Sequence, residues 1–362
     1  MERNLHILSP NAPKALGSAL MHDLYYIIQE LAKKGIKSNL HIPFYEQLDP
    51  KTYESTQQLY RYKNDVETEV GEISFSFIDE ALSNIQNISG PVLYYGNTES
   101  LMYLHKTIKG QRKIFFRMLF QESLGAKDQV KFYPWGLKKI KQYLKVRKLD
   151  DALLQLKKTS ITSLVDHEQK WGLNTSYAKI PAFTGMPFAF FHENKGSFCL
   201  FHGDLKEKEN EYAAFWLLEH VFNKLEIPFV IAGNDPSDEL EKAAHLRMHT
   251  CLVANPTDTE LNELIKKAQL NLLPSFSYER KDMNLYRCMN LGKHILTNRK
   301  GLPKEYQADC LSISENPDEF INQIPELFDQ PFTETVHLKR VGILNQLYKD
   351  QDSIEKLITL LF

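Results

Sequence analysis

Hydrophobic and polar residues alternate along this chain in two patterns. Short runs rich in Val, Ile, Leu and Phe are separated by longer segments in which apolar residues recur every three or four positions. The first pattern predicts buried strands and the second predicts amphipathic helices. The predicted strands are NLHILS, KSNLHIPF, PVLYYG, KIFFRML and SITSLVD in the first half, and SFCLFHG, PFVIAGN, TCLVANP, LNLLPSF, KHILTN and CLSIS in the second.

Helices are expected between these runs. One is predicted at Ala19–Lys34, where Gly35 supplies a common C-terminal signal. A long basic helix is predicted from Leu137 to Lys158. Strands that alternate with helices are typical of an α/β fold with mostly parallel sheets. In the second half, the predicted N-caps are Asn210, Asp238 and Asp258.

The chain divides at a segment without clear periodicity. IPAFTGMPFAFFHENKGS holds two prolines and two glycines, which is typical of a linker. We therefore expect two tandem, doubly wound Rossmann-like domains that face each other across a cleft. Ligands of such sheets bind beyond the carboxyl ends of the strands. The expected segments are 1–181 (first domain), 182–196 (linker), 197–335 (second domain) and 336–362 (a helical segment that packs back).

Composition narrows the class of protein. The chain has 362 residues and a net charge of -2, which argues against nucleic acid as the main partner. Four cysteines lack any CxxC pairing, so we expect free thiols in a reducing cytoplasm and no metal site. The N-terminus has the pattern of a strand rather than a signal peptide. No apolar run approaches the roughly 20 residues of a membrane span, so we expect a cytoplasmic, soluble protein.

One stretch suggests a ligand site. In PSFSYERKDMNLYRCMNLGKHILTN, Pro274–Asn298, an apolar run ends in a polar elbow and an amphipathic helix follows. Arg280 and Lys281 stand at the start of that helix, where the helix dipole also favours anions. Two interpretations are open, a phosphate site and a solvated charged face.

From Ser197 onward, the order of elements becomes specific. LFHGDLKEKENEYAAFWLLEHVF, PFVIAGNDPSDEL, LVANPTDTELNELIKKAQLNLLPSF and GKHILTN follow one another. This series resembles the nucleotide-sugar-binding domain of GT-B glycosyltransferases of the retaining family 4 group. It looks closest to a mannosyltransferase-like branch common in Bacteroidetes. HILSPNAPKALGSALMHDLYYIIQELAKKGIKSNLHI is similar to the opening of the first domain of that fold.

The resemblance implies roles for residues at the elbow. The family places a Glu there for the sugar and a second Glu eight positions later for the ribose. Glu279 stands at the first position and Arg287 at the second. After the first strand of this domain, Asp204 stands in place of the usual Arg. Asn210 and Glu211 likewise replace a Lys-Gly pair.

In the first domain, the resemblance points to the loop after KIFFRML. Leu119 and Ser123 stand where the family has histidines, while Arg117 and Glu122 remain. The catalytic candidates are therefore Glu279, Glu122 and Arg117. The donor-binding candidates are Gly17, Gly203, Asn210, Gly233, Asn255, Ser275, Ser277, Glu279, Arg280, Lys281 and Arg287. Several have structural alternatives, such as an N-cap for Asn210, a special dihedral for Gly17 and a dipole contact for Glu279.

The resemblance implies a glycosyltransferase that moves a hexose from a nucleotide sugar to a surface-glycan or lipid-linked acceptor. No Asp-x-Asp pair stands at a strand end, so we expect no cofactor and no bound metal. The alternative is a catalytically degraded GT-B protein that binds a nucleotide or a partner enzyme without transfer. Arg287, Asp204 and the replaced histidines favour this alternative. A weaker third hypothesis, a GT-B epimerase, lacks paired histidines and carboxylates.

The basic helix 137–158 also has two interpretations. Its apolar residues are interleaved with lysines, a pattern that suits peripheral contact with an anionic inner membrane, where lipid-linked acceptors are found. The alternation of strands and helices favours the other interpretation, a solvated helix of the domain.

Overall fold

Two parallel sheets organise the part of the chain that the computed structural model describes, namely residues 4–9, 19–42, 74–77, 90–96, 98, 101, 113–119, 122–156, 158–165, 176–185, 191, 194–277, 283–302 and 310–362. Within these residues, one sheet has seven strands in the order β3-β2-β1-β4-β5-β6-β7, and the other has six in the order β10-β9-β8-β11-β12-β13. Every paired strand runs parallel to its neighbour. In both sheets the chain starts in the middle, moves outward and then reverses, as in doubly wound nucleotide-binding folds.

The strands of the first sheet are β1 (Asn4–Leu8), β2 (Lys37–Ile42), β3 (Ser74–Phe77), β4 (Val92–Tyr95), β5 (Ile114–Met118), β6 (Thr162–Val165) and β7 (Tyr177–Lys179). Those of the second are β8 (Cys199–Asp204), β9 (Phe229–Asn234), β10 (Thr250–Ala254), β11 (Leu270–Leu273), β12 (His294–Thr297) and β13 (Ser312–Ile313). Each predicted strand is confirmed. The prediction missed β3 and β7, whose sequences SFSF and YAK contain no continuous apolar run.

The helices of the described residues fill the intervals between strands. Between β1 and β6 along the chain they are α1 (Ala19–Lys33), α5 (Glu122–Gln129), η1 (Val130–Phe132) and α6 (Leu137–Leu156). Around the second sheet they are α7 (Lys208–Trp216), η2 (Leu217–Val221), α8 (Asp238–His245), α9 (Asp258–Lys267), α10 (Met283–Leu291), η3 (Arg299–Gly301) and α11 (Pro317–Asp329). The chain ends with α12 (Glu334–Leu347) and α13 (Asp350–Leu361).

The predicted N-caps of the second half are wrong by one to three residues. The caps are Glu207, Ser237 and Thr257, not Asn210, Asp238 and Asp258. The hydroxyls of Ser237 and Thr257 accept backbone N–H bonds, and Glu260 completes a capping box with Thr257. At α8 and α9 the hydroxyl residue takes the capping bond, and the aspartate after it lies in the first turn, where the helix dipole favours acidic side chains.

Two units emerge from the packing of the chain. The first comprises residues 1–123, 147–185 and 348–362, and the second comprises 124–146 and 186–347. The passage between the units at residues 185 and 186 falls inside the expected linker. Residues 124–146 group with the second unit, although the sequence analysis placed them in the first domain. The C-terminal segment is shared, with α12 in the second unit and α13 in the first.

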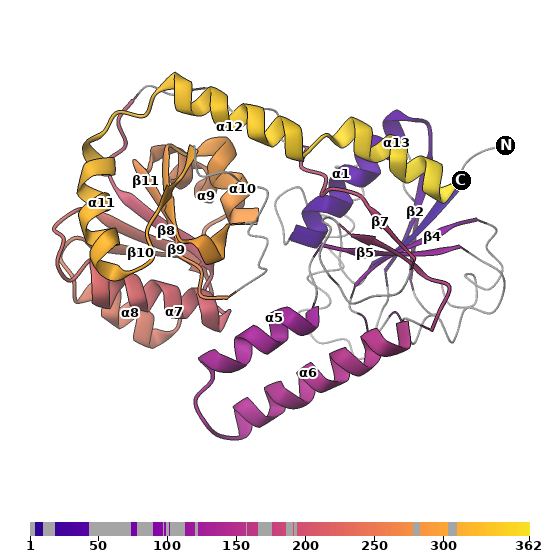
Figure 1. Ribbon diagram of the computed structural model, residues 1–362, viewed down its shortest axis with the longest axis horizontal. Helices are drawn as coiled ribbons and strands as arrows, with labels where there is room; N and C mark the ends of the chain where they lie inside the picture. Colours follow the sequence, from indigo (N-terminus) through magenta and orange to yellow (C-terminus); the bar gives the residue numbers. More distant parts are fainter. Residues whose placement is uncertain are drawn as a thin grey trace. The chain divides into compact units, whose positions relative to one another are not determined.

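The core of the first unit contains residues from both ends of the chain. Leu5 of β1 and Ile27 of α1 belong to one buried cluster with Ile354, Leu357 and Leu361 of α13. Figure 1 shows α13 beside α1, in agreement with their mutual contacts. The first unit is therefore completed by the last helix of the chain.

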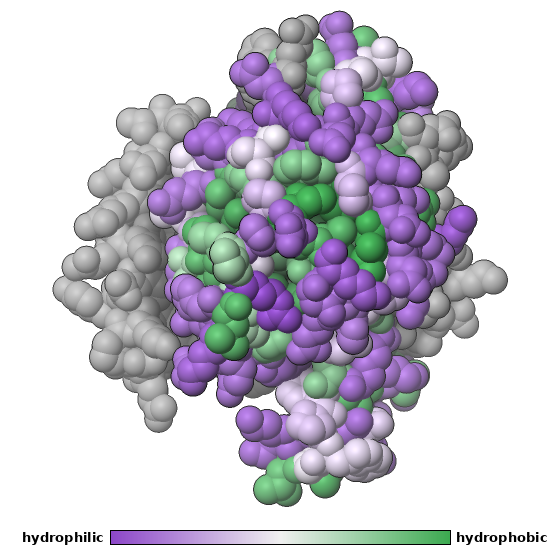
Figure 2. All heavy atoms as spheres, turned by 90° about the vertical axis from the view of Figure 1, so that its left-hand side faces the viewer, coloured by the Kyte–Doolittle hydropathy of each residue, from purple (hydrophilic) through white to green (hydrophobic). Residues whose placement is uncertain are grey.

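The second unit has a separate core on its six-stranded sheet. Helices α7 and α8 lie on one side of the sheet, and α9 and α10 lie on the other (Figure 1). Leu217, Leu240 and Phe320 are buried together with the apolar residues of β8, β9 and β11. Figure 2, a view onto the left side of Figure 1, shows a mostly hydrophilic face with hydrophobic residues gathered near its middle. On this face, hydrophilic residues thus surround the hydrophobic ones.

Candidate nucleotide-sugar site

The strand order places a switch point between β8 and β11 in the second unit. These neighbouring strands begin the two halves of the sheet, because the chain winds outward to β10 and then returns to β11. In open α/β sheets, ligands bind beyond the carboxyl ends of strands at such a point. The loops that follow β8 and β11 are therefore the candidate site.

Glu209 organises the loop after β11. This glutamate lies in the first turn of α7, and only 3% of it is exposed. Its Oε1 accepts the backbone N–H groups of Phe276 at 3.0 Å and Ser277 at 2.9 Å, and also the Ser275 hydroxyl at 3.0 Å. The Ser277 hydroxyl donates to its other oxygen. One buried carboxylate thus fixes the elbow Ser275–Ser277 through charge-assisted bonds.

Two other side chains hold the same elbow from outside α7. The Asn298 side chain, after β12, accepts from the Ser275 N–H at 3.1 Å and donates to the Ser275 carbonyl at 2.7 Å. Lys131 of η1 donates to the carbonyl of Phe276. The Phe276 ring also packs edge-on against Tyr212, with centroids 4.9 Å apart. The elbow is therefore held by contacts from α7, from η1 and from the segment after β12.

The loop after β8 is closed by Asn210. Its amide Nδ2 donates to the carbonyl of Asp204 at 2.9 Å, across the turn. A Cβ at Gly203 would lie 3.0 Å from the Asn210 side chain, so Gly203 lets that side chain pack against the strand end. The structure thus assigns both donor-binding candidates a role in shaping the loop.

Gly233, another donor-binding candidate, lies within β9. A Cβ there would lie 2.0 Å from the carbonyl oxygen of Gly203, so only glycine lets β8 and β9 pair at this point. The turn comes two residues later at Asp235, whose φ is 48°. Asn255 has a φ of 51°, and its Oδ1 accepts the Asp235 N–H at 3.0 Å. The loops after β9 and β10 are thus joined at the edge where the candidate site lies.

Two lysines follow β8 on the surface. Lys206 is 3.6 Å from Asp235, and Lys208 is 2.5 Å from Glu211. Exposed ion pairs contribute little to stability, so these ammonium groups can exchange their carboxylate partners for another anion. They place positive charge beside the switch point.

The guanidinium of Arg287 in α10 is held in an ion pair. Its Nη2 lies 3.3 Å from Asp258 at the start of α9, and the Arg287 side chain is 12% exposed. Its charge also acts on His202 in β8. Burial, and next the charge of Arg287, lower the pKa of His202 to about 3. The His202 Nε2 lies 3.1 Å from the Cys288 sulfur, so neutral His202 is part of the interior.

The side chains of five predicted site residues lie outside the described part of the structure. Gly17, Glu279, Arg280 and Lys281 lie outside the described residues, and of Glu122 only the backbone is described. Their roles stay predictions.

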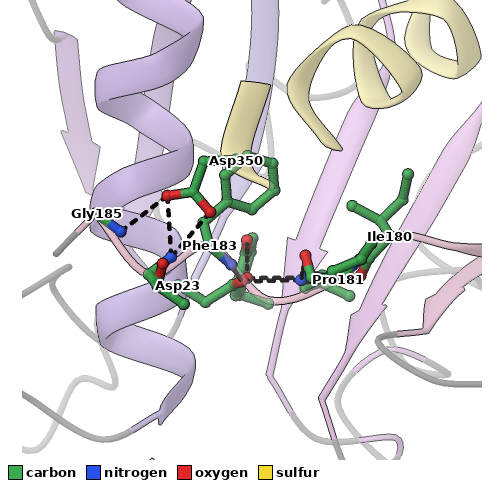
Figure 3. A network of polar contacts seen from close by, with 9 residues as sticks. Asp23, Ile180, Pro181, Phe183, Gly185 and Asp350 are labelled. Carbon is green, nitrogen blue, oxygen red and sulfur yellow. Dashed lines mark hydrogen bonds and ion pairs between the residues drawn. The ribbon is translucent and has the colours of Figure 1, made fainter. Parts of the chain in front are cut away.

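Arg117 has a structural role in place of the expected catalytic one. Its side chain is fully buried and forms a bidentate pair with Asp23 of α1, with both N–O distances 2.8 Å. It also donates to the carbonyls of Ile180 and Pro181 (Figure 3). The same Asp23 accepts bonds from the Tyr95 hydroxyl and the Phe183 N–H, both at 2.8 Å or less. This network binds α1, β4 and β5 to the segment 180–183.

Asp350 extends the network to the C-terminal helix. Its carboxylate accepts the N–H groups of Thr184 and Gly185, at 3.2 and 2.8 Å (Figure 3). Burial raises the pKa of Asp350, while these two backbone bonds act in the opposite direction. Residues 184–185 and 350 lie beside two of the four places where the chain passes between units, so one carboxylate joins these two segments of the first unit.

All four cysteines of the chain are free thiols. Cys199, Cys288 and Cys310 are buried free thiols, as predicted, whereas Cys251 is exposed. Among the residues with described positions, no group of three or more His, Cys, Asp or Glu side chains is placed to hold a metal ion. In the same part of the chain, no helix is long and apolar enough to cross a membrane.

Comparisons with known proteins agree on the fold. A scan against protein-family models finds no match, and a search of curated proteins finds none either. Among solved structures, Anabaena Alr3699/HepE in complex with UDP and glucose is 10% identical, covers 99% of both chains and has a TM-score of 0.65. A TarM variant from S. aureus, in complex with fondaparinux, α-GlcNAc-glycerol and UDP, is 8% identical over 99% of both chains, with a TM-score of 0.66. A glycosyltransferase from Rickettsia africae is 8% identical over 99% of this chain and 98% of its own, with a TM-score of 0.64. The chain therefore has the GT-B fold, with two Rossmann-like domains, as the sequence predicted.

Sequence reasoning missed the residues that hold the elbow. Glu209, Lys131 and Asn298 contact it from positions between 23 and 145 residues away in the chain. An acidic residue in a first helical turn is common, so Glu209 carried no distinctive signal. The two serines that flank Phe276, each a donor without an obvious acceptor, were the one local hint.

Proposed function

We propose that this protein is a glycosyltransferase that transfers a hexose from a nucleotide sugar. The supporting observation is the rigid elbow Ser275–Ser277, which Glu209 holds at the switch point of a GT-B domain. Proteins of this fold include HepE, whose structures contain UDP and UDP-glucose. Preorganised positioning of donor and acceptor is a large source of rate in such reactions.

The resemblance suggests the finer details of this proposal. The protein would belong to the retaining family 4 group, and its acceptor would be a glycan or a lipid-linked sugar of surface polysaccharide assembly. It would act in the cytoplasm, in peripheral contact with the inner membrane through the basic helix 137–158. The donor diphosphate would be neutralised without a metal by Lys206, Lys208, Arg280 and Lys281, with help from the N-terminus of α10. Transfer should then continue undiminished in a chelator.

Binding of nucleotides tests the site directly. Calorimetry with UDP, GDP, ADP and one sugar conjugate of each should identify one base that binds. Glu209→Gln removes an acceptor and places an amide N–H against donors, so the elbow should loosen and affinity should fall about tenfold or more, equivalent to about 1.4 kcal/mol. The matched control is Glu239→Gln, which changes an exposed glutamate in the first turn of α8 and should leave affinity unchanged. Equal affinities for the two variants would contradict a site at the elbow.

The second candidate function is a degraded GT-B protein that binds a nucleotide or partner without transfer. The ion pair between Arg287 and Asp258 favours this second candidate. Arg287 stands at the position where the family has its second glutamate, and its charge is already paired with a carboxylate of the protein. In an active enzyme, Arg280→Ala and Lys281→Ala should each weaken nucleotide binding by about 1.5–3 kcal/mol where the bond is buried. In a degraded one, these variants should bind as the wild type does, and Arg287→Glu should improve affinity. Transfer of radiolabelled sugar to a membrane extract would exclude the second candidate.

A further inference from the structure

Strand β10 forms one edge of the second sheet, and its own sequence carries none of the usual protections of an edge strand. Within the described residues it pairs only with β9. Its five residues, TCLVA, include no proline and no charged side chain. By comparison, the opposite edge of the same sheet, β13, has two residues, and β7, an edge of the first sheet, has three and ends in Lys179. Short strands and lysines are common means of preventing edge-to-edge pairing, so β10 is open to a further strand.

The backbone groups of β10 that point away from β9 are those of alternate residues. The His249 carbonyl accepts an N–H of β9 at 2.8 Å, and the Asn255 N–H donates to a carbonyl of β9 at 2.9 Å. Successive residues of a strand direct their N–H and C=O groups to opposite sides. The groups of Thr250, Leu252 and Ala254 therefore point outward, and of these the Thr250 N–H donates to the preceding turn at 3.2 Å.

Exposed apolar side chains lie next to this edge. Leu246 and Met248, in the turn before β10, are 84% and 96% exposed. Within the strand, Cys251 and Ala254 are exposed as well. An uncharged edge with apolar neighbours is typical of a surface at which two strands associate.

The charge along the edge changes sign from one end of β10 to the other. Residues 242–249, which precede the strand, contain Lys242 and Arg247 and no Asp or Glu. Residues 255–263, which follow it, contain Asp258, Glu260 and Glu263 and no Lys or Arg. An antiparallel copy of the strand would place each basic end beside an acidic end, whereas a parallel copy would bring like charges together. The edge is therefore complementary to itself about a two-fold axis.

We infer that β10 is a homodimer interface, in which the strands of two copies pair antiparallel about Leu252. In this register the two Leu252 residues exchange N–H···O=C bonds, and the Ala254 N–H of each copy donates to the Thr250 carbonyl of the other. The two six-stranded sheets then continue into each other across the two-fold axis. This inference goes beyond the proposed function and does not depend on it, since β10 is two strands away from β8 at the switch point.

Sedimentation velocity over a series of protein concentrations tests the oligomeric state. The wild type should form a dimer. Cys251→Lys should raise the dissociation constant of the dimer about tenfold or more, because two lysines would meet across the two-fold axis. Cys251 is exposed, so the circular dichroism of this variant should be unchanged. The matched control is Tyr177→Lys, which changes a 54% exposed residue of another edge strand, β7, and should leave the dimer intact. A wild type that is monomeric at every concentration, or equal dissociation constants for the two variants, would overturn the inference.

A disulfide cross-link tests the register of the two strands. With Leu252 opposite itself, Cys251 of one copy faces Val253 of the other in a non-hydrogen-bonded pair, whose Cα atoms are about 4.5 Å apart. Val253→Cys should therefore cross-link to the native Cys251 of the second copy when copper–phenanthroline is the oxidant, and a non-reducing gel should show the dimer. When Cys251→Ser is added, the only cysteines left at the edge are diagonal neighbours about 7–8 Å apart, and the cross-link should disappear. The other three cysteines are buried. Cross-linking of both variants, or of neither, would contradict the antiparallel pairing.

Discussion

At the scale of single residues, we expect the free energy of unfolding to depend strongly on the Asp23–Arg117 ion pair. Both side chains are within 1% of full burial, and the pair is bidentate. Arg117→Met would leave a buried carboxylate without its cation, which typically costs about 3–5 kcal/mol. Urea unfolding followed by circular dichroism measures this loss. Lys195→Met, which breaks an exposed pair with Asp329, should change stability by less than about 1 kcal/mol. Similar losses in the two variants would contradict the structural role of Arg117.

His202 makes stability depend on pH. Its pKa is about 3 in the folded protein and about 6.5 in the unfolded chain. Between these values the unfolded chain binds the extra proton, so the stabilising contribution of neutral His202 is fully present above pH 6.5. It is lost as the pH falls toward 3, by up to about 1.4 kcal/mol per pH unit.

His202→Asn removes this term. The difference between wild-type and variant free energies of unfolding should therefore shrink as the pH is lowered from 7.5 to 4.5. Burial lowers the pKa of His41 and His294 as well and raises that of Asp350. These groups are common to both proteins, so their effects cancel in the difference. A constant difference across the range would show that the pKa of His202 is the same in the folded and unfolded states.

The sequence identified the elbow after β11 better than the residues that hold it. The elbow after β11 was found because an apolar run ends there in polar residues. Glu209 was not found, since its partners Phe276 and Ser277 are distant in sequence. Arg117 was misjudged for the same reason. The sequence alone does not distinguish a buried arginine from an active-site arginine. The fold does so here, because it places Asp23 beside Arg117.

At the scale of elements, the pairing of β8 with β9 depends on Gly233. A Cβ at this position would clash with the Gly203 carbonyl, so Gly233→Ala should force the strands apart and cost about 1–3 kcal/mol. Gly342→Ala is the matched control, because no atom lies within 4 Å of its Cβ position and it sits inside α12. There alanine should stabilise the protein by about 0.5–1 kcal/mol. Thermal unfolding should thus shift in opposite directions, and a shift in the same direction would contradict the close approach.

Local pattern was sufficient for the strands that carry a continuous apolar run. It failed for β3 and β7, which are completed by their neighbours rather than by their own residues. The starts of α8 and α9 were predicted one residue too late. Ser237 and Thr257 cap these helices, and the aspartates that follow them lie in the first turn. Element type follows from periodicity, whereas element ends depend on single hydrogen bonds.

At the scale of the whole molecule, the sequence predicted that the last segment packs back, but not which core each part of it joins. A helical tail was predicted, but the division between α12 and α13 depends on which core each helix joins. Residues 124–146 are a similar case, since their link to the second unit runs through Lys131 and through Phe132, which packs on Tyr212 with ring centroids 5.4 Å apart. Such long-range choices are made by tertiary contacts and leave little trace in local composition.

The place of α13 in the first core sets an order of events on the ribosome. Domains generally fold N-terminal first during synthesis, at about 5–20 residues per second. Here the core that begins at Leu5 also needs Ile354, Leu357 and Leu361. Its last residues leave the exit tunnel only after the second unit, which ends at Leu347, has been made. The N-terminal half must therefore wait with apolar surface uncovered while the later half matures, and chaperones that bind nascent chains would meet this half first.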